Sequence, residues 1–266
     1  MEPRIRIEFR RVCKRFVARE RGTEEVTAVE DVSVAVRDGE VVSIIGPSGC
    51  GKSTLLNMGA GLYLPSAGEV YVDGERVAGP NPHVAFMLQK DLLLPWRTIR
   101  ENVELGLEIR RVRAAERRER AMALIERCHL AGFERHYPHQ LSGGMRQRAA
   151  LARTLAVAPT VLLMDEPFSA LDAQTKMILQ QDLARTLAEE GKTALFITHD
   201  LVESIVLSDR ILVMSPRPGR IVEEIPVDMP GRDAPIRRRL DARVGPLAAH
   251  LMEQLHIGEP VAAEAH

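Results

Sequence analysis

Apolar and polar residues alternate in two early segments of the chain, residues 4–16 and 27–40. Alternation of this kind places the apolar side chains on one face, so both segments are predicted to be strands of a half-buried sheet. Residues 40–45, "EVVSII", form instead a short apolar run that is typical of a strand covered on both faces. Similar runs recur at residues 83–89, 160–166, 193–199 and 210–215. Together these patterns predict an α/β fold built on an open, parallel central sheet.

Helical spacing dominates residues 102–130, where charged and apolar residues recur every three or four positions. This stretch lies between two predicted core strands, so we expect a helical block inserted into the core. Its mixture of Arg and Glu is typical of a solvated helix face, with a nucleic-acid contact as the alternative. Residues 216–219, "PRPG", predict a hairpin between two late strands. The expected boundaries are a core at about residues 1–88 and 158–230, a helical subdomain at about 89–157, and a tail with one helix at 231–266.

Composition narrows the class of protein. The 266 residues are 45% hydrophobic and 27% charged, with a formal net charge of -1, so the chain is expected to fold and shows no overall basic character for nucleic acid. Cys13, Cys50 and Cys128 are far apart and lack metal-ligand spacing, which favours reduced thiols. We expect neither a signal peptide nor a membrane-spanning segment, because no apolar run approaches roughly 18 residues. Any membrane role is therefore expected to be peripheral.

A phosphate-binding loop is predicted at residues 46–54, "GPSGCGKST", between the strand at 40–45 and a helix at 52–62. Glycines let the backbone N–H groups approach a phosphate, and the helix N-terminus favours an anion. Lys52 should reach the terminal phosphates, and the Ser53 hydroxyl should bind Mg²⁺. An ordinary glycine turn is the alternative, and the strand, loop and helix order disfavours it. The expected nucleotide-binding residues here are Gly46, Pro47, Ser48, Gly49, Cys50, Gly51, Lys52, Ser53 and Thr54.

Cys50 lies in this loop beside Lys52, at a helix N-terminus. Such an environment favours a reactive thiol. We therefore expect alkylation of Cys50 to block the site and bound nucleotide to protect it.

Polar residues end several of the apolar runs. Asp165 and Glu166 follow "VLLM" and are expected to point to opposite sides of the strand, Asp165 to Mg²⁺ and Glu166 to the water that attacks a phosphate. Gln89 and His199 end two other predicted strands. An open parallel sheet binds its ligand at this carboxyl edge, although each residue taken singly fits an ordinary turn equally well.

The chain resembles the ATP-binding subunit of an ABC transporter over residues 4–230. The motifs that carry the resemblance are "GPSGCGKST" as Walker A, Gln89 as the Q-loop, "LSGGM" at 141–145 as the signature, "VLLMDE" as Walker B, "SALD" as the D-loop and His199 as the switch histidine. The resemblance implies a P-loop NTPase core of the RecA-like type, with an inserted α-helical subdomain and an antiparallel β-subdomain, in an ABC ATPase domain at residues 1–230.

The resemblance also implies ATP and Mg²⁺ as cofactors. It makes Lys52, Gln89, Glu166 and His199 the catalytic residues, and Ser53, Gln89 and Asp165 the metal ligands. Phe16 matches the aromatic residue that stacks on adenine, with plain core packing as the alternative.

The signature segment explains why one chain has a second phosphate-binding shape. In the family two copies meet head to tail, so the resemblance implies that Ser142, Gly143 and Gly144 bind the nucleotide held by a partner chain. A glycine-rich helix cap without a ligand is the alternative. The expected partner is a second copy of this chain or a homologous ATPase subunit.

Directly after Gln89, the chain continues with "KDLLLPWRT". Leu92, Leu93, Leu94 and Trp96 are too apolar for a free loop, so we expect docking to a transmembrane permease, or packing under the helical subdomain. Together with "MSPRPGRI" at 214–221, this segment resembles the nitrate, sulfonate and taurine importer branch. The resemblance implies import of a small anionic solute, a separate solute-binding protein and a location on the cytoplasmic face of the membrane. An exporter or lipid-transport ATPase, or a soluble ABC ATPase acting on ribosomes or DNA, is the alternative.

Overall fold

The computed structural model describes residues 4–17 and 25–257. Its centre is a six-stranded sheet. Neighbouring strands of this sheet are parallel except at one edge, where β9 and β10 form an antiparallel hairpin. Every residue of β3, β7 and β8 is buried, as the continuous apolar runs predicted. In spatial order the strands are β10 (Ile221–Pro226), β9 (Arg210–Met214), β3 (Val41–Ile45), β8 (Thr193–Ile197), β7 (Val161–Asp165) and β6 (Val84–Met87).

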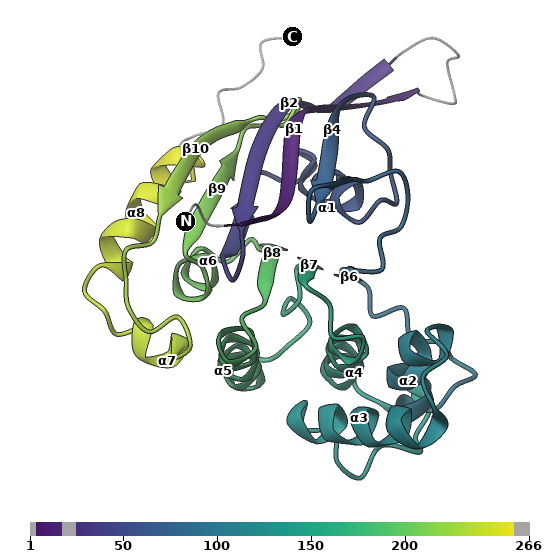
Figure 1. The fold of residues 1–266 in the computed structure, drawn as a ribbon. Helices are drawn as coiled ribbons and strands as arrows, with labels where there is room; N and C mark the ends of the chain where they lie inside the picture. The colour runs from purple at the N-terminus through teal and green to yellow at the C-terminus, as the bar shows by residue number, and fades with distance from the viewer. Residues whose placement is uncertain (1–3, 18–24, 258–266) are drawn as a thin grey trace, which may run out of the picture.

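A second, antiparallel sheet covers one face of the central sheet. Its order is β2 (Glu25–Arg37), β1 (Ile5–Val17), β4 (Ala67–Val72) and β5 (Glu75–Arg76). The first two strands are those that the alternating segments predicted. Helix α1 (Lys52–Gly59) lies between the two sheets, and its buried Leu55 and Leu56 join both in one core cluster. In Figure 1 this sheet and α1 lie above strands β8, β7 and β6 of the central sheet, and α4 and α5 lie below these strands.

The opposite face is covered by helices α5 (Ala173–Glu189) and α6 (Leu201–Leu207), together with part of the inserted block. That block, between β6 and β7, comprises α2 (Ile99–Ile109), α3 (Ala114–Arg127), a short 3-10 turn at Pro138–Gln140 and α4 (Gly143–Ala156). The predicted helical stretch is therefore divided, and Thr98 caps α2 through a capping box with Glu101.

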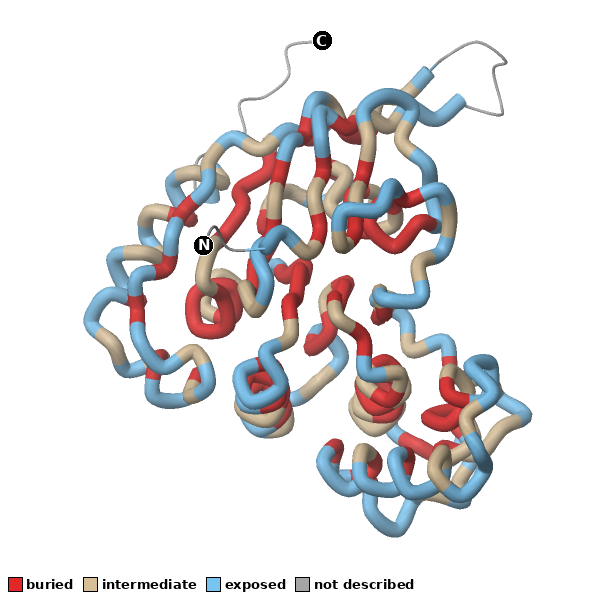
Figure 2. The backbone as a smooth tube through the Cα atoms, in the orientation of Figure 1, coloured by how far each residue is buried: buried red, intermediate tan, exposed pale blue. Residues whose placement is uncertain are grey.

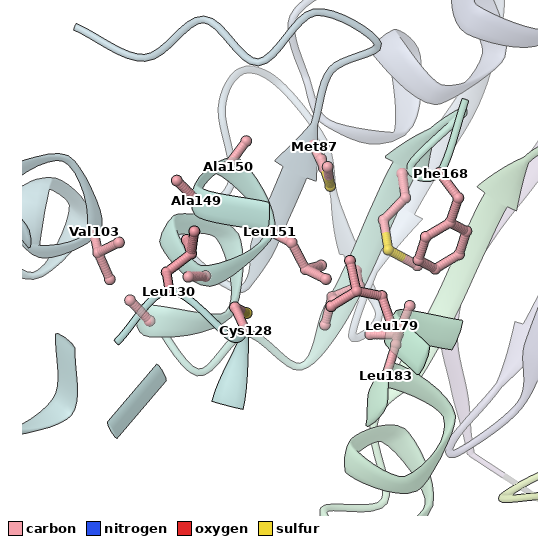
Figure 3. Packing of buried hydrophobic residues seen from close by; sticks show 14 of the residues in the cluster. Met87, Val103, Cys128, Leu130, Ala149, Ala150, Leu151, Phe168, Leu179 and Leu183 are labelled. Carbon is pink, nitrogen blue, oxygen red and sulfur yellow. The ribbon is translucent and has the colours of Figure 1, made fainter. Parts of the chain in front are cut away.

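Helix α4 is shared between the block and the core. Figure 3 shows Leu151 of α4 between Val103 and Leu130 of the block and Phe168, Leu179 and Leu183 of the core, all in one cluster. A single apolar cluster thus crosses the expected boundary, so packing does not separate the block from the core. The division at residues 89–157 stays a prediction. Buried residues concentrate on the central strands and on the inner helix faces, while much of α3 is exposed (Figure 2).

The tail forms two helices, α7 (Pro235–Arg238) and α8 (Val244–Gln254), where the sequence predicted one. Helix α8 packs against α6 and β10, in a third apolar cluster. Arg238 is buried, and its guanidinium donates to the carbonyls of Val206 and Ser208 at the end of α6 and to that of Met229. The bonds to Val206 and Ser208 satisfy carbonyls that the end of α6 leaves unpaired. No helix among the described residues is long and apolar enough to cross a membrane.

Replacing Arg238 by Met should lower the free energy of unfolding by about 2–4 kcal/mol, because buried carbonyls lose a charged donor. Chemical denaturation followed by circular dichroism measures the change. Arg237→Met is the matched control, since this neighbour is exposed and its loss should stay within about 0.5 kcal/mol. Equal losses for the two variants would show that Arg238 does not anchor the tail.

Candidate functional site

The loop between β3 and α1 depends on two glycines with left-handed backbones. Gly49 has φ 74° and Gly51 has φ 109°, a region that other residues adopt only with strain. A Cβ on Gly51 would lie 2.6 Å from the Ala28 carbonyl oxygen, so β2 passes directly against the loop. Gly51 is also the N-cap of α1, and no side chain among the residues that the structure describes caps this helix end. The first N–H groups of α1 are therefore available to an anion.

Lys52 bends back over the same loop. Its Nζ donates to the carbonyls of Gly46 at 2.7 Å and Pro47 at 2.8 Å. A cavity of about 600 Å³ opens beside it. The residues that line the cavity are Phe16, Val26, Ala28, Gly46, Ser48, Gly49, Gly51, Lys52, Ser53, Thr54, Gln89, Glu166, Ile197, His199 and Arg217. A larger opening, of about 720 Å³, lies against β1 and β2 and contains none of the predicted site residues.

Three polar residues that follow the carboxyl ends of β6, β7 and β8 lie together, because Gln89 and His199 both approach the Oε2 atom of Glu166. Gln89 Nε2 donates to Glu166 Oε2 at 3.2 Å. His199 Nδ1 lies 3.4 Å from the same oxygen, and the His199 side chain is 68% exposed. The structure therefore brings together three predicted residues that are far apart in the sequence, at the rim of the cavity.

Asp165 lies deeper than Glu166. It is buried, burial raises the pKa of its carboxyl, and a hydrogen bond from the Ser53 hydroxyl opposes that rise. The two acids do not alternate on one strand as expected. Strand β7 ends at Asp165, and Glu166 has φ 49°, so a left-handed turn directs Glu166 to the cavity.

Other predicted residues differ in where the structure places them. Phe16 lines the cavity and packs edge-on against Tyr63, with ring centroids 5.7 Å apart. Pro47 and Cys50 belong to the loop but do not line the cavity. Cys50 is 1% exposed, a burial that disfavours the reactive thiol predicted for this position. A position at a helix N-terminus does not determine which way the side chain points.

The signature residues are not part of this cavity. Ser142 and Gly143 are exposed at the start of α4, and Gly144 follows them. Ser142 Oγ accepts a hydrogen bond from the Met145 backbone N–H at 3.3 Å, which caps the helix. A single chain therefore holds one phosphate loop at its cavity and a second, separate helix N-terminus elsewhere.

The apolar run after Gln89 divides between core and surface. Leu93 is buried and Leu94 is half-buried, whereas Leu92 is 53% and Trp96 is 71% exposed. The backbone here is fixed, because Arg153 donates to the carbonyls of Asp91 and Leu92. Leu93 therefore packs in the cluster that includes the helical block, as one of the two expectations had it, while docking stays a prediction. Leu92 and Trp96 are the exposed apolar side chains of this run.

Sequence reasoning missed Arg217. This residue lies in the turn between β9 and β10 and lines the cavity. Its Nε and Nη2 donate to the Gly49 carbonyl at 3.2 and 3.1 Å. The only sequence signal was the "PRPG" turn. This turn predicted a hairpin, but it did not indicate a contact with a loop almost 170 residues earlier.

The profile of the ABC transporter family matches residues 29–169, which is more than half of the chain. The chain belongs to the ABC transporter family. An uncharacterised ABC transporter ATP-binding protein of Methanocaldococcus jannaschii is 48% identical over 204 residues, 77% of this chain and 76% of that protein. The taurine import ATP-binding protein TauB of Yersinia pestis is 45% identical over 207 residues, 78% of this chain and 81% of TauB.

Solved ABC cassettes have the same fold. A dimeric ATP-binding cassette in a post-hydrolysis state with bound ADP and Pi is 34% identical, with a TM-score of 0.76, over 84% of this chain and 99% of that one. A second dimeric structure of a bacterial ABC transporter cassette is 35% identical, with a TM-score of 0.77. The predicted fold class is confirmed. Within the family, the chain is an ATP-binding subunit with ATPase activity.

Because the Cys50 thiol is buried, iodoacetamide should label it in the native protein far more slowly than Cys13, which is partly exposed. Cys128 is the control for a buried thiol, since burial raises its pKa to about 12. Mass spectrometry of native and urea-unfolded protein measures the three rates. Native labelling of Cys50 as fast as that of Cys13 would mean that the phosphate loop opens readily in solution.

Proposed function

We propose that this ABC ATPase subunit hydrolyses ATP in a head-to-tail dimer and thereby drives the import of a small anionic solute through separate membrane subunits. The observation that carries the catalytic part is the meeting of Gln89 and His199 at one Glu166 oxygen, beside a phosphate loop. A carboxylate held by two polar groups at the rim of a cavity is suited to orient and deprotonate a water molecule.

The adenine of the nucleotide is assigned to the apolar end of the cavity, and its phosphates are assigned to the polar end. Phe16 stacks on adenine, and the backbone N–H groups of the loop and of α1 hold the phosphates. Lys52 exchanges its loop carbonyl partners for the terminal phosphates. The loop residues of this nucleotide site are Gly46, Pro47, Ser48, Gly49, Cys50, Gly51, Lys52, Ser53 and Thr54.

Mg²⁺ fits the donors beside the loop. The Ser53 hydroxyl and the Asp165 carboxylate are hard oxygen ligands that already contact each other, and the Gln89 amide oxygen is assigned as a third ligand. Within the described residues no group of three or more His, Cys, Asp or Glu side chains could hold a metal ion. The cation would therefore take its remaining ligands from phosphate oxygens and water, as Mg²⁺ commonly does. It would neutralise charge on the phosphates.

In the reaction, Glu166 accepts a proton from water as the water oxygen bonds to the γ-phosphorus. The bond from that phosphorus to the β,γ-bridging oxygen breaks, which leaves ADP and phosphate. His199 and Gln89 hold the Glu166 carboxylate in place. Because the His199 side chain lies largely in solvent, a covering surface would be needed to exclude bulk solvent from the site while retaining the attacking water.

That covering surface is assigned to a second copy of the chain. Ser142, Gly143 and Gly144 present an exposed helix N-terminus away from their own cavity. Two similar solved cassettes are dimers, which supports a dimer here. In a head-to-tail pair, each signature segment closes the cavity of the other chain, so that two sites form together.

The transport role rests on the exposed apolar surface at Leu92 and Trp96. Exposed apolar groups at a fixed loop favour a docked partner, here a transmembrane permease that docks near Leu92, Leu93, Leu94 and Trp96 through the two exposed side chains, Leu92 and Trp96. Similarity to a taurine import ATP-binding protein supports import of a small solute with an acidic group such as a sulfonate. A separate solute-binding protein would deliver this solute. The subunit would then work on the cytoplasmic face of the membrane. A permease of another class copurifying with the chain would contradict the import role.

Glu166→Gln should retain ATP affinity within about twofold and lose about 10²–10⁴ of the hydrolysis rate, because the change removes only the proton acceptor. Lys52→Ala should weaken ATP binding as well as turnover, since it removes a cation that contacts phosphate. Titration calorimetry and phosphate release measure the two effects. If Glu166→Gln kept turnover near that of the wild type, the general-base assignment would be wrong.

A disulfide should form between chains when cysteines replace Ser48 and Ser142 in a Cys13→Ser background. Ser48 lines the cavity, and Ser142 caps α4 outside it, so only a partner chain brings the two together in a closed dimer. ATP should raise the yield of the intermolecular product on a non-reducing gel. The single Ser142→Cys variant is the control. Crosslinking confined to single chains, or indifferent to ATP, would contradict the head-to-tail arrangement.

A further inference from the structure

The turn between β9 and β10 is fixed by backbone hydrogen bonds to strand β2, beside the phosphate loop. The Gly219 N–H donates to the Ala28 carbonyl, and the Glu30 N–H donates to the Gly219 carbonyl, both at 3.0 Å. A Cβ on Gly219 would lie 2.0 Å from the Cys50 carbonyl oxygen, so the two loops are in direct contact. The β9–β10 turn therefore has its position without help from the side chain of Arg217.

Arg217 extends from this turn over the phosphate loop. Two of the five guanidinium N–H groups donate to the Gly49 carbonyl. Within residues 4–17 and 25–257, Arg217 has no carboxylate partner. The other arginines of the hairpin differ, because Arg220 pairs with Glu30 at 2.8 Å and Arg210 pairs with Glu40 at 3.0 Å. Arg217 thus has unused donors at the cavity, whereas Arg220 and Arg210 are neutralised.

The charges of the residues that line the cavity indicate which ligand the unused Arg217 donors would bind. Among the described residues that line it, Lys52 and Arg217 are the permanent cations, and Glu166 is an anion. A triphosphate brings several negative charges, which Lys52 alone does not balance. A guanidinium matches two phosphate oxygens with two parallel hydrogen bonds, a geometry that the point charge of a lysine lacks.

We propose that Arg217 is a phosphate-binding residue of the nucleotide site, which contacts ATP and ADP through its guanidinium from the β9–β10 turn. The proposal rests on the proposed function, in that the nucleotide occupies this cavity. It assigns to the "PRPG" turn a role in binding the polyphosphate. A merely structural Arg217 would instead tie the turn to Gly49 and would affect all nucleotides alike.

The test compares Arg217→Gln with Arg217→Lys and with Arg220→Gln, a matched change in the same turn that does not reach the cavity. Dissociation constants for ATP, ADP and AMP come from displacement of a fluorescent nucleotide. Arg217→Gln should weaken ATP about 5- to 10-fold, a range that allows for solvent exposure, and change AMP less than about twofold. Arg217→Lys should lie between wild type and Arg217→Gln, and Arg220→Gln should match the wild type.

The dependence of ATP affinity on salt concentration gives a second readout. Removing a cation that contacts phosphate should flatten this dependence in Arg217→Gln but not in Arg220→Gln. Unchanged ATP affinity in Arg217→Gln, or an equal loss for ATP and AMP, would overturn the proposal. Lys52→Ala, measured in parallel, separates the two hypotheses. If Lys52→Ala also left ATP affinity unchanged, the cavity would not be the nucleotide site and the proposed function itself would fail.

Discussion

The close approach of three backbone segments at the phosphate loop is the constraint on which the candidate site depends. Strand β2 passes the loop at Gly51, where a Cβ would lie 2.6 Å from the Ala28 carbonyl oxygen. The β9–β10 turn approaches from another side at Gly219, where a Cβ would lie 2.0 Å from the Cys50 carbonyl oxygen. Only glycine permits both contacts. They hold the loop in a shape that presents α1 and Lys52 to the cavity, and they bring Arg217 within reach of Gly49.

The register of the parallel strands brings the remaining residues of the site together. Met87 pairs with Met164 on neighbouring strands, and Asp165 pairs with Ile197 on the next pair. The residues that follow these strand ends, Gln89, Glu166 and His199, therefore emerge at one edge. A one-residue slip of a strand would turn its side chains to the opposite face. The buried strands, whose apolar residues fill cores on both faces, thus keep the polar residues together.

Much of this architecture could be predicted from the sequence, because burial leaves a periodic trace. The alternating and continuous apolar runs predicted β1, β2 and the central strands, and the order of strand, glycine loop and helix predicted the phosphate loop. Contacts between distant segments leave no such trace. The path of Arg217 to Gly49 depends on how closely Gly219 approaches the loop, and the burial of Cys50 depends on which way its side chain points. The sequence also did not show that the apolar side of helix α4, within the predicted helical subdomain, packs on both that block and the core.

We propose that each chain carries half of each catalytic site and that ATP joins two chains. The most direct measurement is the mass of the Glu166→Gln protein by sedimentation, with and without ATP, together with the nucleotide content of the sedimenting species. We predict a monomer without nucleotide and, with ATP, a dimer that holds two ATP molecules, because hydrolysis no longer separates the chains. A Glu166→Gln protein that is saturated with ATP, at ATP concentrations far above the dissociation constant, and yet remains a monomer would contradict the proposed ATP-dependent dimer.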